Sequence, residues 1–263
     1  METILDKILK EKEKEIRKLK ENQTTQLDVV LPKRSLIEKL KKAEELAVIA
    51  EFKRASPSKG IINGAADPVQ QAKHYEESGA SAISVLTDQT FFKGSFEDLK
   101  VIREAVGIPV LCKDFIISRI QIDFANASGA DLILLIAAVL DEDQLFDLYN
   151  YAKSKGLEPL VEVHNAEELD KAICIKAELI GINNRDLRNF NVSLETTQQL
   201  AGRVKSSGSF LISESGIFTQ ADAETVRNAG ANGILVGEAL MRSGDIQKNL
   251  TDLRVPLLKG AAK

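Results

Sequence analysis

Lysine and glutamate side chains interrupt short segments that are otherwise rich in Val, Ile and Leu. Glu51 and Lys53 fall at the end of one such segment, and Lys113 falls at the end of another. Glu162 and Glu214 occupy similar positions in two further segments. Side chains of these types, held together in a partly enclosed site, can transfer protons to and from a substrate. The residue types therefore indicate acid–base chemistry if the fold brings the segments together.

The spacing of these charges indicates which of them share a face. Side chains of a strand alternate between its two faces, so Glu51 and Lys53 lie on the same face, and Lys113 shares a face with the leucine two residues before it. Asn183 and Arg185 end a further segment in the same way. Ion pairs that serve only stability are the alternative, because a buried charge must be paired. Since several separate segments end in a charge, the pattern favours a functional site.

Turns that contain glycine follow three of the apolar segments and could bind a phosphate group. One turn holds Ser215 and Gly216, and another holds Gly237 and Glu238. A third turn, Ser-Pro-Ser-Lys-Gly, begins at Ser56. Backbone N–H groups in such turns bind phosphate in many parallel α/β barrels, and glycine permits close approach of the ligand. Each turn alone could merely shape the chain, but together they predict a phosphate site.

Short apolar segments alternate with amphipathic stretches from residue 47 onward, a pattern typical of repeated βα units. The apolar segments span residues 47–53, 82–87, 110–115, 131–137, 158–163, 179–184, 210–215 and 233–237. Eight such units in 263 residues predict a single domain folded as an α/β, (β/α)8 or TIM, barrel. Catalytic residues of this fold come from the carboxyl ends of several strands, where the charges described above lie.

Residues 1–46 precede the first unit and predict a helical extension. Apolar residues at helical spacing, among them Ile4 and Ile8, favour a helix over residues 2–22. A second helix is expected after Ser35, a good N-cap residue, with apolar positions that continue to Leu46. We interpret the many Lys and Glu side chains of these helices as a solvated face.

Composition and charge argue against several classes of protein. The net charge of −4 disfavours general binding to nucleic acid, which depends on clustered Lys and Arg. The longest apolar run, 132–140, is far shorter than the roughly 20 residues that span a bilayer, so no membrane span is expected. The charged N-terminus lacks a signal-peptide pattern, which predicts a cytoplasmic location. Cysteine and histidine are not clustered at ligand spacing, so no metal site is predicted.

Seven motifs of the chain closely resemble those of the indole-3-glycerol-phosphate synthase family. They are EFKRASPSKG at 51–60, LTD at 86–88, FFKGS at 91–95, LCKDF at 111–115, VEVH at 161–164, GINNRDL at 181–187 and SESGI at 213–217. The first and sixth of these are long and unusual, which makes the resemblance specific. It extends over nearly the whole chain.

The resemblance implies conversion of 1-(2-carboxyphenylamino)-1-deoxyribulose 5-phosphate to indole-3-glycerol phosphate in tryptophan biosynthesis, with loss of carbon dioxide and water and without a cofactor. Lys113 would be the general acid at the ketone oxygen, provided that burial or neighbouring cations lower its pKa toward neutrality. Lys53 would hold the substrate carboxylate or assist the later dehydration, in which Glu162 would be the general base. The division of the acid steps between the two lysines stays open.

Further residues would orient and bind this substrate by similarity to the family. The lysines and the ribulose hydroxyl groups would be oriented by Glu51, Asn183 and Glu214. The phosphate would lie near Lys53 and Arg185, on backbone groups of Ser56, Ser215, Gly216, Gly237 and Glu238. The apolar slot for the anthranilate ring would be formed by Phe92, Phe115, Leu134 and Leu187. The extra N-terminal helices would cover the mouth of the barrel.

Two alternatives remain open at this point. Another phosphate-binding barrel, such as the isomerase that makes this substrate, would lack the long N-terminal extension and the Glu-x-Lys pattern of the first strand. A catalytically silent barrel could bind an aryl sugar phosphate or act as a scaffold, but it would have no need to keep costly inward charges. The expected partner is a small-molecule sugar phosphate. The synthase interpretation and both alternatives also allow contact with other enzymes of the tryptophan pathway.

Overall fold

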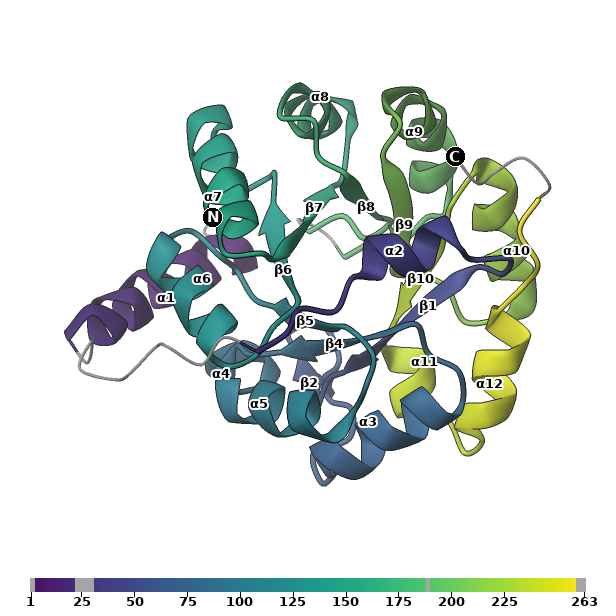
Figure 1. The fold of residues 1–263 in the computed structure, drawn as a ribbon, viewed down its shortest axis with the longest axis horizontal. Coiled ribbons are helices and arrows are strands. Elements are labelled where there is room, and N and C mark those ends of the chain that lie inside the picture. Colours follow the sequence, from purple (N-terminus) through teal and green to yellow (C-terminus); the bar gives the residue numbers. More distant parts are fainter. Residues whose placement is uncertain (1–2, 22–30, 188–189, 259–263) are drawn as a thin grey trace.

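Eight parallel strands close into a barrel in the computed structural model of the protein, which describes residues 3–21, 31–187 and 190–258 (Figure 1). Neighbouring strands pair in chain order, and β1 also pairs with β10, which closes the ring. The barrel strands are β1 (Ala47–Phe52), β4 (Ala82–Leu86), β5 (Val110–Lys113), β6 (Leu132–Ile136), β7 (Glu158–Val163), β8 (Leu179–Asn183), β9 (Phe210–Glu214) and β10 (Gly233–Val236). A small antiparallel hairpin after β1 consists of β2 (Ala55–Ser56) and β3 (Gly60–Ile61).

Helices alternate with the strands and surround the barrel (Figure 1). They are α1 (Ile4–Glu21), α2 (Leu36–Lys41), α3 (Pro68–Glu77), α4 (Gln89–Phe92), α5 (Phe96–Ala105), α6 (Arg119–Ala127), α7 (Glu142–Ser154), α8 (Ala166–Cys174), α9 (Glu195–Ser207), α10 (Gln220–Ala229), α11 (Glu238–Met241) and α12 (Ile246–Leu253). The predicted barrel is therefore confirmed, and its strands begin and end within two residues of the predicted bounds. Over the described part of the chain, no helix is long and apolar enough to span a membrane.

Alternate residues along the strands separate into two hydrophobic clusters. Ile49 and Leu111 belong to the cluster inside the barrel, whereas the residues that flank them pack against the surrounding helices. Glu51 and Lys113 each lie two residues further along the same strand and point inward as well. The same alternation turns the polar side chains near the ends of three other strands inward, namely Glu162, Asn183 and Glu214.

The second N-terminal helix lies at the end of the barrel opposite the predicted mouth, which corrects the expectation that both helices cover the mouth. Leu36 and Leu40 of α2 pack into the inner cluster at the amino ends of the strands, and α2 lies in front of the barrel centre in Figure 1. Glu158, the first residue of β7, accepts hydrogen bonds from the N–H groups of Leu36 and Ile37 at 2.9 and 3.2 Å. The Ser35 hydroxyl also donates to Glu158.

The first N-terminal helix reaches the carboxyl ends of the strands, as expected. Lys12 of α1 forms ion pairs with Asp88, which follows β4, and with Asp114, which follows β5. Ser35 is confirmed as the N-cap of α2, since its side chain accepts a hydrogen bond from the N–H group of Glu38. That helix ends at Lys41, earlier than the apolar spacing had indicated.

Glu158→Ala is expected to lower the free energy of unfolding by about 2 kcal/mol, because it removes the charged acceptor of the hydrogen bonds that hold the start of α2. Urea unfolding measures the change. Glu104→Ala, at an exposed position of α5, is the matched control and should alter stability by less than about 0.5 kcal/mol. Equal stability of the two variants would show that Glu158 does not hold α2 in place.

Candidate active site

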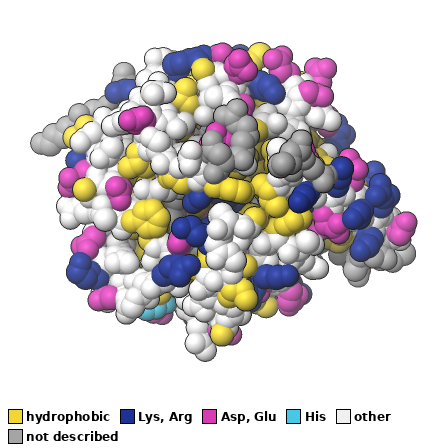
Figure 2. Space-filling view, turned by 180° about the vertical axis from the view of Figure 1, so that it is seen from behind, with side chains coloured by type: hydrophobic (Ala, Val, Ile, Leu, Met, Phe, Trp, Pro, Cys, Tyr) yellow, Lys and Arg dark blue, Asp and Glu magenta, His cyan; other side chains and the backbone are white. Residues whose placement is uncertain are grey.

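A cavity opens at the carboxyl ends of the barrel strands, on the face seen in Figure 2, where Lys and Arg side chains lie in a hollow among hydrophobic ones. With the exception of Glu214, all the predicted site residues line this cavity: Glu51, Lys53, Ser56, Phe92, Lys113, Phe115, Leu134, Glu162, Asn183, Arg185, Leu187, Ser215, Gly216, Gly237 and Glu238. Glu214 is buried, with 1% of its surface exposed, and contacts Lys113. The fold therefore gathers residues from distant parts of the sequence in one place.

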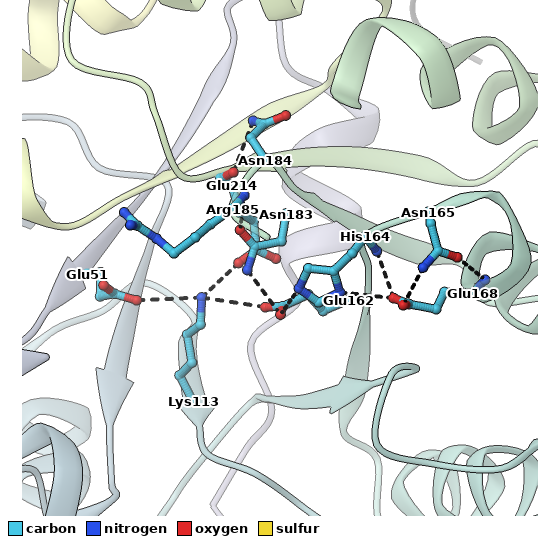
Figure 3. A network of polar contacts seen from close by, with 10 residues as sticks. All are labelled: Glu51, Lys113, Glu162, His164, Asn165, Glu168, Asn183, Asn184, Arg185 and Glu214. Atoms are coloured by element: carbon cyan, nitrogen blue, oxygen red, sulfur yellow. Dashed lines mark hydrogen bonds and ion pairs between the residues drawn. The ribbon is translucent and has the colours of Figure 1, made fainter. Parts of the chain in front are cut away.

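Lys113 lies at the centre of the charged groups of the cavity (Figure 3). Its ammonium nitrogen, Nζ, lies 2.7 Å from Oε2 of Glu214. The same nitrogen lies 3.6 Å from Oε2 of Glu51 and 3.9 Å from Oε2 of Glu162. These carboxylates come from β9, β1 and β7, so only closure of the barrel brings them around the end of β5.

Lys53 extends the same network on the other side of Glu51. Its Nζ lies 2.5 Å from Oε1 of Glu51, so this carboxylate bridges the two lysines. Two glycines leave room for the buried carboxylates: a Cβ atom at Gly237 would collide with Glu51, and one at Gly181 would collide with Glu214. The described residues hold no group of three or more His, Cys, Asp or Glu side chains arranged to bind a metal ion.

The two carboxylate oxygens of Glu162 have different surroundings. Oε1 accepts a hydrogen bond from the side-chain amide of Asn183 at 3.1 Å and lies 3.3 Å from Nε2 of His164. Oε2 faces Lys113. Asn183 is held in turn by the N–H group of Arg185, which donates to its Oδ1 at 3.0 Å. Glu162 is thus fixed through one oxygen while the other faces the central lysine.

Contacts within the network set the charge of each carboxyl group. Burial opposes the charge of Glu162, but the contact with His164 and the charge of Lys113 outweigh it and hold the pKa of Glu162 well below its usual range. Burial also opposes the charge of Glu51, whose pKa is nevertheless lowered by Lys53 and Lys113. Burial raises the pKa of Glu214 to about 7, and the charge of Glu162 acts in the same direction. Among the three carboxyl groups around Lys113, Glu214 is therefore the one whose surroundings most favour the protonated form.

The pKa of Lys113 is raised, whereas the role of general acid had been expected to require a lowered pKa. Burial alone would lower it, but the surrounding carboxylates, above all Glu214, outweigh burial and favour the ammonium form. Lys113 is therefore fully charged. An ammonium group in this state can donate a hydrogen bond to an oxygen that gains negative charge, and it can release its proton as that oxygen becomes more basic.

The turns predicted to bind phosphate follow β1, β9 and β10, which are neighbours in the barrel, and all three turns line the cavity. Ser215 and Gly216 have φ angles of 66° and 81°, a left-handed conformation that glycine adopts without strain. Asn184 anchors this turn, because its side-chain amide donates to the backbone oxygens of Glu214 and Ser215 at 3.0 Å. Asn184 is buried, and its role in holding the turn was not anticipated from the sequence.

An apolar wall forms another part of the cavity lining. The rings of Phe92 and Phe115 lie with their centroids 6.2 Å apart, and Leu134 joins the inner cluster of the barrel. The amino-terminal part of α1 adds three apolar side chains to the lining, namely Ile4, Leu5 and Ile8. The cavity can therefore hold a flat apolar group against this wall and an anion at the turns.

The family model described as indole-3-glycerol phosphate synthase matches residues 5–253. The chain belongs to this family. A curated indole-3-glycerol phosphate synthase of Oceanobacillus iheyensis is 52% identical over 98% of each chain. That of Exiguobacterium sibiricum is 55% identical over 91% of this chain and 92% of its own, and that of Bacillus mycoides is 51% identical over 97% and 99%. The resemblance inferred from the sequence motifs is confirmed.

A solved structure outside the indole-3-glycerol phosphate synthase family shares the fold. Thiamine phosphate pyrophosphorylase from Pyrococcus furiosus superposes with a TM-score of 0.60 and 21% sequence identity, over 83% of this chain and 96% of that chain. At this level of identity the likeness concerns the barrel architecture alone.

Lys12 links α1 to the ends of two barrel strands, a contact that the sequence did not reveal. The sequence pattern predicts that the charges of α1 form a solvated face, but the Lys12 side chain is completely buried. Its Nζ lies 2.8 Å from Oδ2 of Asp88 and 2.7 Å from Oδ1 of Asp114. Burial opposes its charge, yet these two carboxylates raise the pKa of Lys12. The other lysines of α1 are exposed, so burial at this tertiary contact distinguishes Lys12 from them.

Lys12→Met is expected to lower the free energy of unfolding by about 3 kcal/mol, because it leaves two buried carboxylates without their cation. KM should also rise, since α1 supplies Ile4, Leu5 and Ile8 to the cavity wall. Lys18→Met, at an exposed position of the same helix, is the matched control. Thermal unfolding and steady-state kinetics measure both effects. A stability and a KM equal to those of the control would show that Lys12 does not anchor the helix.

Proposed function

We propose that the protein closes the indole ring of indole-3-glycerol phosphate, starting from 1-(2-carboxyphenylamino)-1-deoxyribulose 5-phosphate and releasing carbon dioxide and water. The observation that carries this proposal is the Lys113 ammonium group, surrounded by three carboxylates at the base of a cavity with a polar rim and an apolar wall. Membership of the indole-3-glycerol phosphate synthase family supports the same reaction, which belongs to tryptophan biosynthesis.

Ring closure requires a proton donor at the ketone oxygen of the substrate. The aromatic carbon that bears the carboxylate attacks the ketone carbon, and the electron pair of the C=O bond moves to oxygen. In the proposal, Lys113 donates a hydrogen bond to this oxygen and then its proton. The neighbouring carboxylates keep Lys113 protonated before the substrate arrives and favour its reprotonation afterwards.

Decarboxylation follows because ring closure interrupts the aromaticity of the anthranilate ring. The bond between the ring carbon and the carboxylate breaks, its electron pair restores aromaticity, and carbon dioxide leaves. The enzyme needs to supply only position and electrostatic stabilisation in this step. Lys53 is the proposed partner of the substrate carboxylate, since its ammonium group lines the cavity next to Glu51.

Dehydration completes the indole. The new hydroxyl group leaves as water after it receives a proton from a lysine, and Glu162 removes a proton from the five-membered ring so that the double bond can form. Oε2 of Glu162 faces Lys113, and both groups line the cavity, which supports a concerted role for the acid and the base. Glu51 and Glu214 would hold the lysines, and Asn183 would hold Glu162.

The remaining residues would position the two ends of the substrate. The phosphate would lie on the backbone of the turns that contain Ser215 and Gly237, near Arg185. The anthranilate ring would lie against the apolar wall, formed by Phe92, Phe115, Leu134 and Leu187. The ketone carbon would then lie between these ends, beside Lys113.

A fluorescence assay tests the proposal directly. Purified protein is mixed with the carboxyphenylamino-deoxyribulose phosphate and with a chelator, and emission from the indole product is followed over time. The chain contains no Trp, so the protein adds little emission of its own. Turnover is the expected result. Saturable binding of the compound without turnover would overturn the proposal and favour a barrel that only binds an aryl sugar phosphate.

A further inference from the structure

His164 lies directly beyond the end of β7, two residues after Glu162 and on the same face of the strand. In the structure, His164 lies between two carboxylates: its Nε2 is 3.3 Å from Oε1 of Glu162, and its Nδ1 is 2.9 Å from Oε2 of Glu168 (Figure 3). Its side chain is largely buried, with 11% of its surface exposed.

Glu168 is itself fixed in place by the start of α8. Its Oε2 also accepts a hydrogen bond from the backbone N–H group of His164 at 2.8 Å. Its Oε1 accepts one from the side-chain amide of Asn165 at 2.7 Å, and Asn165 is the N-cap of α8. The imidazole ring is therefore oriented by a rigid helix end rather than by a loop.

The charge of the imidazole follows from its two partners. Nδ1 is hydrogen-bonded to Glu168, and Nε2 lies within ion-pair distance of Glu162, so the carboxylates on both sides favour the imidazolium form. Burial alone would lower the pKa of His164, but the contacts with Glu162 and Glu168 outweigh burial and raise it to about 10. His164 therefore carries a positive charge at neutral pH and places it beside the proposed general base.

We propose that His164 is a positioning residue that keeps Glu162 ionised and turned so that its second oxygen faces the reacting part of the substrate. The proposal rests on the assignment of Glu162 as the general base. The role of His164 is inferred from the different partners of the two Glu162 oxygens. His164 and Asn183 contact Oε1, whereas Oε2 faces Lys113. Without His164, the carboxylate would be held by Asn183 alone on that side.

The pH dependence of kcat distinguishes this role from a purely structural one. A general base must be deprotonated, so activity is lost as the pH falls through the pKa of Glu162. Lys113 and His164 lower that pKa, whereas the charge of Glu214 opposes ionisation of Glu162 from the other side of Lys113. Removal of the His164 charge raises the pKa of Glu162, and the acid limb of kcat must therefore move to higher pH. Glu51 faces Lys113 and is unchanged by the substitution.

The test compares His164→Gln with His74→Gln, which replaces the other histidine of the chain at an exposed position of α3. His164→Gln should lower kcat about tenfold and shift the acid limb by about one pH unit or more, with KM nearly unchanged. His74→Gln should leave the whole profile unchanged. An unaltered profile in folded His164→Gln would overturn the proposal. If His164→Gln does not fold, Glu168→Gln decides, because it weakens the charge of His164 and should shift the limb in the same direction.

A second measurement does not depend on activity. With only two histidines in the chain, NMR can follow each imidazole, and His74→Gln identifies the signal of His164. The His164 imidazole should stay protonated beyond about pH 8, and its pKa should fall in Glu162→Gln. A neutral His164 at pH 7 would overturn the proposal. An inactive Glu162→Gln together with a normal pH profile in His164→Gln would contradict only the role of His164. A fully active Glu162→Gln would contradict the assignment of Glu162 as the base, and with it the role of His164.

Discussion

Lys113→Ala is expected to lower kcat by at least about a hundredfold, the usual scale for the loss of a general acid. The substitution removes the ammonium group around which Glu51, Glu162 and Glu214 are arranged. It also removes the charge that opposes protonation of Glu214, so the pKa of Glu214 should rise further. Single-turnover kinetics with the carboxyphenylamino-deoxyribulose phosphate measures the loss without interference from product release.

The matched control for this variant is Lys100→Ala, at an exposed position of α5. Its kcat should equal that of the unaltered protein. Thermal unfolding verifies that the Lys113 variant is folded, and Lys113→Met serves as a bulkier replacement if the alanine leaves the cavity unstable. Near-normal kcat in a folded Lys113 variant would remove this lysine from the role of acid. Single-turnover kinetics of Lys53→Ala, compared with those of the Lys113 variant, shows which lysine supplies the proton for ring closure and which for dehydration.

Glu162→Gln is expected to lower kcat by about a hundredfold or more, because glutamine keeps the size of the side chain but cannot take up a proton. The hydrogen bond with Asn183 can be kept by the amide oxygen, so KM should change little. The dehydrated product should form slowly while the decarboxylated intermediate accumulates, since the base acts after loss of carbon dioxide. Rapid quench followed by mass spectrometry measures the intermediate and the product separately.

Glu142→Gln, at an exposed position in the first turn of α7, is the matched control for the Glu162 variant. It should have normal kcat and form no intermediate. Accumulation of unreacted substrate alone in Glu162→Gln would place this residue before ring closure and contradict its assignment to dehydration.

The path of the chain was predictable because the relevant signals are local. Alternating apolar residues such as Ile49 and Leu111 define strands and their inward face, and they carry Glu51 and Lys113 to that face with them. The position of α2 was not predictable in the same way. Amphipathicity shows that a helix has an apolar face, but it does not show which end of a barrel that face will cover. The acceptor that holds α2, Glu158, is more than a hundred residues away in the sequence.

The environments of Lys113 and Lys12 were also not predictable from the local sequence. Burial and neighbouring cations predict a lowered pKa for Lys113, whereas the structure surrounds it with carboxylates that raise its pKa. Lys12 was expected to be solvated and is buried between Asp88 and Asp114. In both cases the sequence shows the residue type but not the distance to its partner, and electrostatic energies depend on distance and burial.

The repeated βα pattern of the sequence predicted the barrel, and alternation along each strand predicted which side chains share a face, since both depend on residue periodicity along the chain. Its motifs also determined the family, because long unusual segments such as residues 51–60 and 181–187 are specific. Only the tertiary structure decided how the charges combine. Lys113 and Glu214 are 101 residues apart in the chain, yet Nζ of Lys113 lies 2.7 Å from Oε2 of Glu214. Closure of the barrel brings these two side chains together.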